Sequence, residues 1–240
     1  MNGLTEIHGH FIYGVDDGAK TEETMLAMLD TAAEQGVTRM FATSHATPGM
    51  EPFPQEIYDR HLEKAREYCA RQGYEITVWP GAELLYNPAL ESYAREHRLP
   101  TLGDSEWVLL EYLPDVPARE LERGLEQLTR CGYSILLAHI ERYACLERRG
   151  FLKALRDSYP IRCQVNCSTV LEPGGFWRRR RLDSWFQNEL VDIVASDAHN
   201  MSSRPIRIRK AYELLRQQYG KEAADRWTGR SGLWFEPELP

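Results

Sequence analysis

The stretch EIHGHFIYGVDDG, residues 6–18, places two histidines one residue apart and follows them with two adjacent aspartates. Neutral imidazole nitrogens and carboxylate oxygens are the usual ligands of divalent transition metals. These residues therefore indicate a metal site that begins at the end of a first strand. An isolated His-x-His is also compatible with a histidine pair on an exposed strand end, so the rest of the chain has to decide.

The composition is that of a globular protein. The chain has 240 residues with 42% hydrophobic content, and no Pro/Gly/Ser linker divides it, so we expect a single domain over residues 1–240. The formal charge is 29 − 36 = −7, which disfavours nucleic acid and anionic membranes as partners. The one basic block, Arg178 to Arg181, is typical of a solvated helix face.

The sequence also indicates the cellular compartment. There is no signal-peptide pattern, and no apolar run approaches the roughly 20 residues of a membrane span, so we expect a cytoplasmic protein without membrane insertion. The five cysteines are odd in number and scattered, which argues against a disulfide framework. Cys163 and Cys167 are most simply buried thiols.

Short apolar segments alternate with segments of helical periodicity. The predicted strands cover residues 5–8, 38–43, 75–79, 107–112, 134–139, 162–166 and 192–196. The predicted helices cover residues 21–36, 55–71, 87–97, 118–131, 145–159, 177–189 and 205–219. This repetition predicts a parallel sheet, closed into a (β/α)7 barrel or, as the competing architecture, left as an open doubly wound sheet.

Polar or metal-binding groups follow every predicted strand at its carboxyl end, where the active sites of such barrels lie. Taken singly, each is more simply a capped strand end or a satisfied core histidine. Taken together, they predict a metal cluster, because residue type and position agree independently. His61 and His97 lie within predicted helices and are expected at the surface. The groups at the strand ends are His8, His10, His45, Glu83, Glu111, His139, Asn166, Asp197 and His199, and Asp17 is expected to reach into the cluster.

Six motifs carry a resemblance to a known family. EIHGH, GVDDG, TSH, GAEL, AHIERY and ASDAHN followed by SRP resemble the PHP (polymerase and histidinol phosphatase) superfamily, and more closely its bacterial capsule-type tyrosine phosphatases, the CpsB/CapC-like family. The resemblance runs from about Glu6 to about Tyr219. It implies a distorted (β/α)7 TIM-like barrel of the PHP fold that holds three divalent metal ions. The metal is usually manganese, with iron, zinc or magnesium as alternatives. The implied substrate is phosphotyrosine on kinases that regulate capsular or extracellular polysaccharide synthesis.

The resemblance also assigns residues. The family's two phosphate-binding arginines fall on Arg142 and Arg204, although Arg142 could instead pair with Glu141 or Glu147. Glu6 stands where the first motif of the family usually has Asp. The last segment, GRSGLWFEPELP, matches nothing in the family pattern. The family's metal ligands fall on His8, His10, Asp17, His45, Glu83, Glu111, His139, Asp197 and His199, with Glu83 shared between metals.

These residues predict hydrolysis with metal-activated water, with the two arginines on the phosphate oxygens. A tyrosine phenolate, whose conjugate acid has a pKa of about 10, is a tolerable leaving group, and no general acid is assigned. The thiol route of tyrosine phosphatases needs Cys-x5-Arg. No cysteine of this chain has Arg six residues later, which leaves the metal route.

Three rival functions remain open from the sequence. A small-molecule PHP phosphoesterase, acting on a histidinol phosphate-like compound or a nucleotide, would share the metals and differ in the loops. A non-catalytic metal-binding scaffold for a kinase would not need the arginines. A metal-dependent amidohydrolase would commonly use a bridging lysine after a middle strand, where this chain has Glu83 and Glu111.

Overall fold

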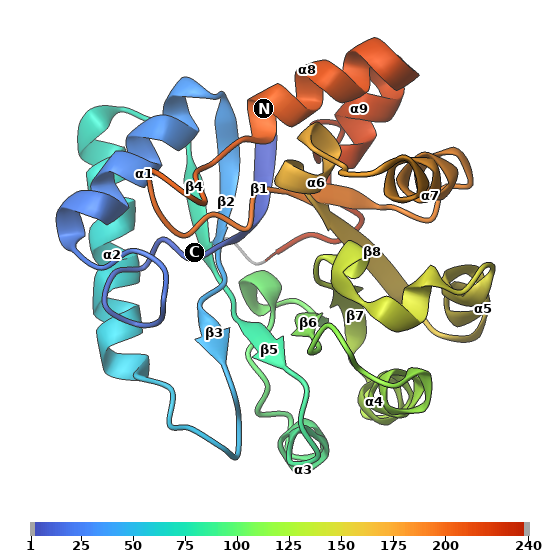
Figure 1. Ribbon diagram of the computed structural model, residues 1–240. Coiled ribbons are helices and arrows are strands. Elements are labelled where there is room, and N and C mark those ends of the chain that lie inside the picture. Colours follow the sequence, from blue (N-terminus) through green and yellow to red (C-terminus); the bar gives the residue numbers. More distant parts are fainter. Residues whose placement is uncertain (1–2, 238–240) are drawn as a thin grey trace.

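The computed structural model describes residues 3–237, in which parallel strands form a ring surrounded by helices (Figure 1). Three short 3₁₀ segments lie at Leu102–Asp104, Ile140–Arg142 and Ala144–Glu147. The strands are β1 (Leu4–Gly9), β2 (Val37–Ala42), β3 (His45–Ala46), β4 (Thr77–Pro80), β5 (Glu83–Leu85), β6 (Trp107–Glu111), β7 (Ser134–Leu137), β8 (Ile161–Asn166) and β9 (Ile193–Ala195). The helices are α1 (Glu22–Glu34), α2 (Gln55–Gln72), α3 (Leu90–Arg95), α4 (Ala118–Arg130), α5 (Phe151–Ser158), α6 (Cys167–Leu171), α7 (Phe176–Gln187), α8 (Ile208–Tyr219) and α9 (Lys221–Trp227).

The ring is a distorted barrel because two of its strands are interrupted. One ladder has the order β1-β2-β4 and the other β3-β5-β6-β7-β8-β9. Two residues separate β2 from β3, and two separate β4 from β5, so each pair continues one strand direction. Nine strands of the described chain therefore occupy the seven positions that the sequence predicts.

Contacts between β1 and the segment after β9 close the ring. The amide of Asp197 donates to the carbonyl of His8 at 3.0 Å, and the amide of His10 donates to the carbonyl of Ala198 at 2.8 Å. A parallel bridge joins Gly9 to Ala198. The open doubly wound alternative is therefore wrong, and closure leaves the first and last strands without free edges.

Alternation along the strands separates two cores. One buried cluster takes every second residue of several strands, such as Leu136 and Ala138, and fills the barrel interior. Their neighbours Ile135 and Leu137 belong to the larger cluster between the strands and the helices. The helix α1 packs on that outer layer as its spacing predicts, with Met25, Met28, Leu29 and Ala32 buried.

The C-terminal segment that lacks a counterpart in the family pattern closes one end of the barrel. Phe235 is buried in the interior cluster, with its ring centroid 6.0 Å from that of Trp107 and 6.1 Å from that of Phe41. Trp234 meets Trp107 edge-on at 5.5 Å. These contacts bring the last described residues beneath the interior, opposite the end where the ligand-type residues lie.

Several helix boundaries differ from the predictions. Residues 145–159 do not form one helix: a 3₁₀ turn is followed by α5, which starts after Gly150 with φ of 79°. The predicted helix 87–97 shortens to α3, because Asn87 makes a side-chain turn onto the amide of Ala89 and His97 adopts φ of 52°. The short helices α6 and α9 were not predicted. None of the helices in residues 3–237 combines the length and apolarity needed to cross a membrane.

Candidate metal centre

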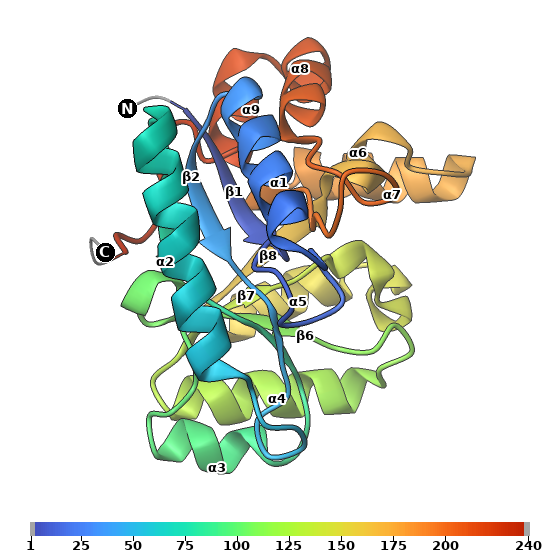
Figure 2. The ribbon, with the colours of Figure 1, turned by 90° about the vertical axis from the view of Figure 1, so that its left-hand side faces the viewer.

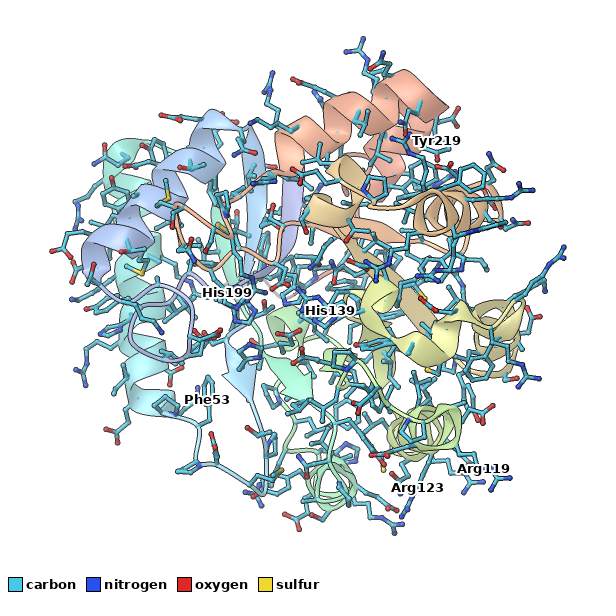
Figure 3. All side chains as sticks on the ribbon, in the orientation of Figure 1. Phe53, Arg119, Arg123, His139, His199 and Tyr219 are labelled. Atoms are coloured by element: carbon cyan, nitrogen blue, oxygen red, sulfur yellow. The ribbon has the colours of Figure 1, made fainter. Side chains whose placement is uncertain are left out.

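The structure brings all nine predicted ligands together at the carboxyl ends of the strands. Figure 3 labels two of them, His139 and His199, which follow β7 and β9 and lie near the middle of the ring. Four overlapping groups have ligand atoms within 4.8 Å of one another. The groups are His10, Asp17, His45 and His199; His8, His10 and Asp197; His8, Glu83 and His139; and His45, Glu83 and Glu111.

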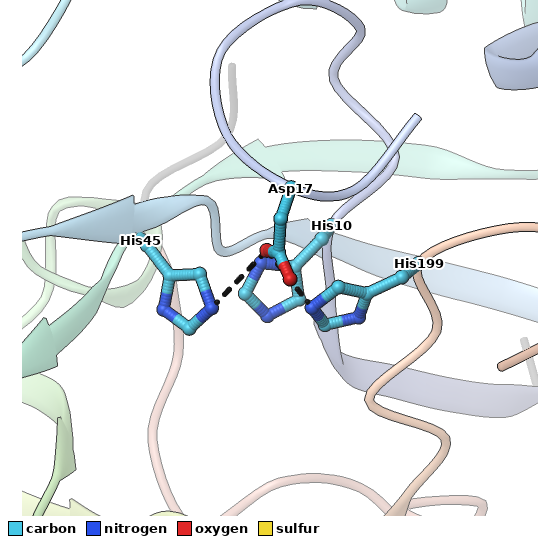
Figure 4. Close-up of side chains that lie close together, drawn as sticks. All are labelled: His10, Asp17, His45 and His199. Carbon is cyan, nitrogen blue, oxygen red and sulfur yellow. Dashed lines mark ion pairs between the residues drawn. The ribbon is translucent and has the colours of Figure 1, made fainter. Parts of the chain in front are cut away.

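Asp17 reaches this cluster from the loop after β1. Its Oδ1 lies 3.4 Å from Nε2 of His45 and 3.3 Å from Nε2 of His199, with His10 behind (Figure 4). The loop folds back because the amide of Ala19 donates to the carbonyl of His10 at 2.9 Å. A Cβ at Gly18 would lie 2.0 Å from that same carbonyl oxygen, so the turn requires glycine. The GVDDG motif thus returns the chain to the end of β1.

Deeper in the site, four acceptor groups face one another. Nε2 of His8 and Nε2 of His10 are 3.2 Å apart. Glu83 places one oxygen 3.3 Å from the first nitrogen and the other 3.2 Å from the second. Asp197 Oδ1 lies 3.6 and 3.5 Å from the same two nitrogens and is buried without a hydrogen-bond partner.

The hydrogen bonds of His8 and His10 determine which ring nitrogens are available to bind a cation. His8 has Nδ1 at 3.2 Å from Oε1 of Gln164, an oxygen that also accepts the amide of His139, and His10 has Nδ1 at 2.8 Å from Asp16. In the neutral form of each ring the hydrogen therefore lies on Nδ1, which leaves the Nε2 lone pair pointing toward the carboxylates. Lone pairs and carboxylates in a buried site need a positive charge between them. The donor set of imidazoles and carboxylates suits a divalent transition metal.

Glu83 and Glu111 extend the cluster across the barrel. Nε2 of His139 lies 2.7 Å from Glu83 and 3.3 Å from Glu111. Nδ1 of His45 lies 3.1 Å from Glu83 and 3.6 Å from Glu111. Glu83 thus contacts four histidines from three segments of the chain, and this central position is the one that a carboxylate shared between metals requires.

Gln164 is a buried site residue that the sequence analysis missed. Its Nε2 donates to Oδ1 of Asn166 at 2.7 Å, and Nδ2 of Asn166 donates to Oδ2 of Asp197 at 2.9 Å. Together with the bonds to His8 and His139, this series of hydrogen bonds links three candidate ligands, His8, His139 and Asp197, to β8. None of the nine candidate ligands lies on β8 itself. The signal was present, since Gln164 lies two residues before Asn166 and so on the same face of the strand.

Asp16 is a second missed residue. Its side chain is 5% exposed, and its oxygens accept the amides of Gly18 and His45, each at 2.9 Å, besides the Nδ1–H of His10. The two aspartates of GVDDG therefore divide their roles, with Asp16 orienting His10 and Asp17 facing the cluster. The sequence alone could not distinguish the two roles, because Asp16 and Asp17 have the same side chain.

Two further residues, His61 and Glu6, are buried in the structure. His61 is buried rather than on the surface: its Nδ1 lies 2.9 Å from the carbonyl oxygen of Tyr13, and the two rings stack with centroids 3.6 Å apart. His97 is exposed as expected. Glu6 is fully buried and accepts the amide of Ser196 at 2.6 Å, which ties β1 to the end of β9.

The pKa values of the clustered histidines reflect competition between burial and mutual charge. Burial opposes a charge on His10, but its hydrogen bonds to Asp16 and Glu83 raise its pKa to about 10. Burial likewise opposes a charge on His139, whose bonds to Glu111 and Glu83 raise its pKa to about 9. Burial and the charge of His10 lower the pKa of His199 to about 4. Protons on His10 and His139 thus offset the negative charge of the neighbouring carboxylates.

The carboxylates show the complementary effect. Burial alone would raise the pKa of Glu83, but the charge of His8 and the hydrogen bonds from His10 and His139 hold that pKa well below its ordinary value. Burial raises the pKa of Glu6 to about 8, since its hydrogen bonds from Ser196 and His8 do not offset desolvation. The backbone is strained at two of the candidate ligands, with φ of 30° at His139 and 52° at Asp197.

The two predicted arginines meet at one atom. Arg142 and Arg204 each donate an Nη2 hydrogen to Oδ2 of Asp197, at 2.6 and 2.7 Å. Their side chains are 37% and 36% exposed, so further N–H groups of both guanidinium ions face solvent at the mouth of the site. The alternative pairing of Arg142 with Glu141 or Glu147 is wrong: Glu141 accepts the amide of Asn166, and Glu147 pairs with Arg181.

Similarity to known proteins extends over nearly the whole chain. The family model described as capsular polysaccharide synthesis, CpsB/CapC, matches residues 4–230. The chain belongs to the CpsB/CapC family. The tyrosine-protein phosphatase CpsB of Streptococcus pneumoniae is 32% identical over 229 residues, which cover 92% of this chain and 93% of that protein. The tyrosine-protein phosphatase YwqE of Bacillus subtilis (strain 168) is 24% identical over 221 residues, which cover 91% and 86%.

A solved structure shares the fold of this CpsB/CapC protein. The matching chain comes from the crystal structures of YwqE from Bacillus subtilis and CpsB from Streptococcus pneumoniae, unique metal-dependent tyrosine phosphatases. It aligns with a TM-score of 0.82 at 24% identity over 99% of both chains. The distorted PHP-type barrel predicted from the motifs is therefore confirmed.

Three buried cysteines of this CpsB/CapC protein, Cys69, Cys163 and Cys167, are unsuited to thiol chemistry. All five are unpaired, and Cys163 and Cys167 are buried as predicted. Burial raises the pKa of the Cys163 and Cys167 thiols far above the ordinary value and that of Cys69 to about 11. Thiols held protonated at neutral pH are poor nucleophiles.

Proposed function

We propose that this protein is a metal-dependent protein-tyrosine phosphatase that hydrolyses phosphotyrosine in a polypeptide substrate. The observation that carries the proposal is the pairing of two solvent-facing arginines with the cluster of nine ligand-type residues at Asp197. The names of the relatives in Streptococcus pneumoniae and Bacillus subtilis support the same activity. A metal-binding scaffold would have no use for phosphate-binding arginines at the cluster.

We propose that the cluster binds three divalent ions, manganese in the cell, with iron, zinc or magnesium as alternatives. When bound, such ions neutralise phosphate charge and lower the pKa of water enough to supply hydroxide at neutral pH. The residues that would hold them are His8, His10, Asp17, His45, Glu83, Glu111, His139, Asp197 and His199.

The chain's own residues then have distinct tasks. Arg142 and Arg204 bind the non-bridging phosphate oxygens with the N–H groups that Asp197 does not use, and Asp197 holds both guanidinium ions in place. These charges stabilise the transition state of phosphoryl transfer, which depends mainly on positioning and electrostatics. The departing tyrosine phenolate needs little protonation because the pKa of the phenol is about 10.

The natural substrate we propose is a tyrosine-phosphorylated kinase that regulates capsular or extracellular polysaccharide synthesis, in keeping with the family description. The five unpaired cysteines fit a reducing compartment, so we propose a cytoplasmic location. We further propose that residues 1–240 act as one domain.

The test is hydrolysis of a phosphotyrosine peptide and of histidinol phosphate by protein stripped of metal and reconstituted with manganese. We expect manganese-dependent release of phosphate from the peptide, well above the rate with the small molecule. Turnover of histidinol phosphate alone would transfer the function to the small-molecule phosphoesterases. No turnover of either compound by metal-loaded protein would favour the scaffold. The amidohydrolase alternative is weakened because Glu83 and Glu111 stand at the middle strands, where a bridging lysine would be expected.

A further inference from the structure

A groove of about 570 Å³ lies directly beside the phosphate-binding arginines. Its walls come from the loop after β6, the 3₁₀ turns after β7, and the segment from α6 into α7. Arg142 belongs to both places, since it lines the groove and donates to Asp197 in the metal cluster. The groove is therefore continuous with the site where we place the phosphate. Residues from its different walls include Pro114, Asp115, Arg142, Arg178, Leu182 and Trp185.

The charges of the groove leave one cation free on the α7 wall. Arg181 pairs with Glu147 at 2.8 Å and lies over the ring of Trp185, while Glu172 pairs with Arg207 at 3.4 Å. The side chain of Arg178 has no ion pair or hydrogen bond to any residue of the described chain. This residue belongs to the basic block 178–181. No residue of that block is a candidate metal ligand or one of the two arginines assigned to the phosphate.

Exposed apolar residues adjoin, in the sequence, groove residues of two different walls. Trp177, next to Arg178, is 76% exposed, and its neighbour Phe176, whose ring it touches edge-on, is 67% exposed. Leu113, next to the groove residue Pro114, is 62% exposed on the opposite wall. Figure 2 shows α7 projecting outward on the side of the molecule where the loop after β1 lies. Exposed aromatic residues beside an arginine are typical of protein-binding surfaces.

We propose that this groove binds the stretch of substrate polypeptide that flanks the phosphotyrosine, and that Arg178 pairs with an acidic side chain of that stretch. The inference rests on the proposed function and names the part of the substrate that a small phosphate ester lacks. The walls carry mixed charge, since the exposed Asp115 lies across from Arg178, and this combination suits a polypeptide better than a uniformly anionic membrane.

Helix α7 provides a matched pair of variants for the test. Arg178, Leu182 and Trp185 line the groove, whereas Arg180 is exposed and does not. Arg178→Glu and Arg180→Glu change the net charge of the protein equally, so they differ only in where the charge is reversed. Trp177→Ser tests the apolar contact. Thermal unfolding of each variant verifies that the fold is retained.

The experiment compares kcat/KM of the manganese-loaded variants on three phosphotyrosine peptides of equal length and on p-nitrophenyl phosphate. The peptides carry Glu, Gln or Lys on both sides of the phosphotyrosine. We expect Arg178→Glu to lower kcat/KM for the Glu peptide about fivefold and to raise it for the Lys peptide, as a single exposed ion pair would. We expect Trp177→Ser to lower kcat/KM for all three peptides. Arg180→Glu should change none of the peptide rates, and no variant should affect p-nitrophenyl phosphate.

Other outcomes would overturn the inference. Equal effects of Arg178→Glu and Arg180→Glu would indicate long-range attraction without a groove contact. Unchanged peptide kinetics, together with loss of binding to phosphatidylglycerol vesicles in both variants, would assign the basic face of α7 to a membrane surface. If the unmodified metal-loaded protein hydrolysed no phosphotyrosine peptide, the proposed function itself would fail. Hydrolysis of all three peptides at the same rate, unaffected by Arg178→Glu, would overturn the groove inference alone.

Discussion

The side-chain oxygen of Gln164 lies 3.2 Å from Nδ1 of His8, so a residue that binds no metal itself fixes which nitrogen of the histidine is free to bind one. The same oxygen accepts the amide of His139 at 2.7 Å, where the backbone turns into the left-handed region. One side chain of β8 thus sets the orientation of two candidate ligands. Partners of this kind influence metal affinity nearly as much as the ligands.

Replacing Gln164 with Leu is expected to weaken metal binding by about 10- to 100-fold. The substitution leaves the buried amide of His139 without an acceptor, and it frees the His8 ring to change tautomer. Manganese affinity, measured by titration of the metal-free protein, tests this expectation. Gln127→Leu, the same change on α4 far from the cluster, is the control, and equal affinities of the two variants would contradict the role of Gln164.

The two aspartates of the GVDDG motif should give different phenotypes. Asp16→Ala removes three accepted hydrogen bonds from a nearly buried carboxylate, so we expect a loss of stability on the order of 2–4 kcal/mol together with weaker metal binding. Asp17 is 62% exposed, and Asp17→Ala should remove metal from the rim with little change in stability. Urea unfolding of the metal-free variants and metal counting after loading separate the two effects. Identical losses of stability would argue against this division of roles.

Arg204→Ala and Arg142→Ala are each expected to lower kcat/KM for a phosphotyrosine peptide by about 10²- to 10³-fold, because each removes charge from the transition state. The metal content should stay at the level of the unmodified protein, since neither guanidinium ion is a ligand. Steady-state kinetics with metal analysis on the same samples tests both statements. Arg207→Ala, which removes a nearby arginine paired with Glu172, serves as control. Loss of metal with retained affinity for vanadate would contradict the assignment.

Removing metal from the loaded protein should lower its melting temperature, and manganese should restore it in a concentration-dependent manner. The physical reason is linkage: a ligand that binds only the folded cluster stabilises the protein by about 2.7 kcal/mol at 100 times its dissociation constant. Differential scanning calorimetry with and without a chelator measures the shift. A melting temperature that does not respond to manganese would be evidence against the cluster as a metal site.

The C-terminal closure of the barrel is a stability element separate from the chemistry. Phe235→Ala should destabilise the protein by about 3 kcal/mol, as truncation of a buried phenylalanine does, and leave metal content unchanged. Leu113→Ala, at an exposed position, should change stability by less than about 0.5 kcal/mol. Chemical denaturation of both variants makes the comparison. A small effect at Phe235 would mean that the interior cluster does not depend on the tail.

The sequence by itself determined the repeating strand–helix pattern and the edge of the sheet at which the site lies. Parallel strands bring their carboxyl ends to the same edge, so His8, Glu111 and Asp197 could be assigned to one site from their positions after apolar segments. The seven strand positions followed from the same pattern. The short helices α6 and α9 did not, because five to seven residues carry too little periodicity to be recognised.

Only the tertiary structure decided how the site is held. Gln164 and His8 are 156 positions apart in the chain, and Asp16 and Asp17 have the same side chain, so no local pattern assigns the supporting hydrogen bonds. Barrel closure through Asp197 and His8, the pairing of Arg142 with Asp197 and the packing of Phe235 beneath the interior are likewise contacts between distant segments. Residue type and position along a strand are local properties that a sequence carries directly. The partner of a buried polar group depends on which segments folding brings within hydrogen-bond distance.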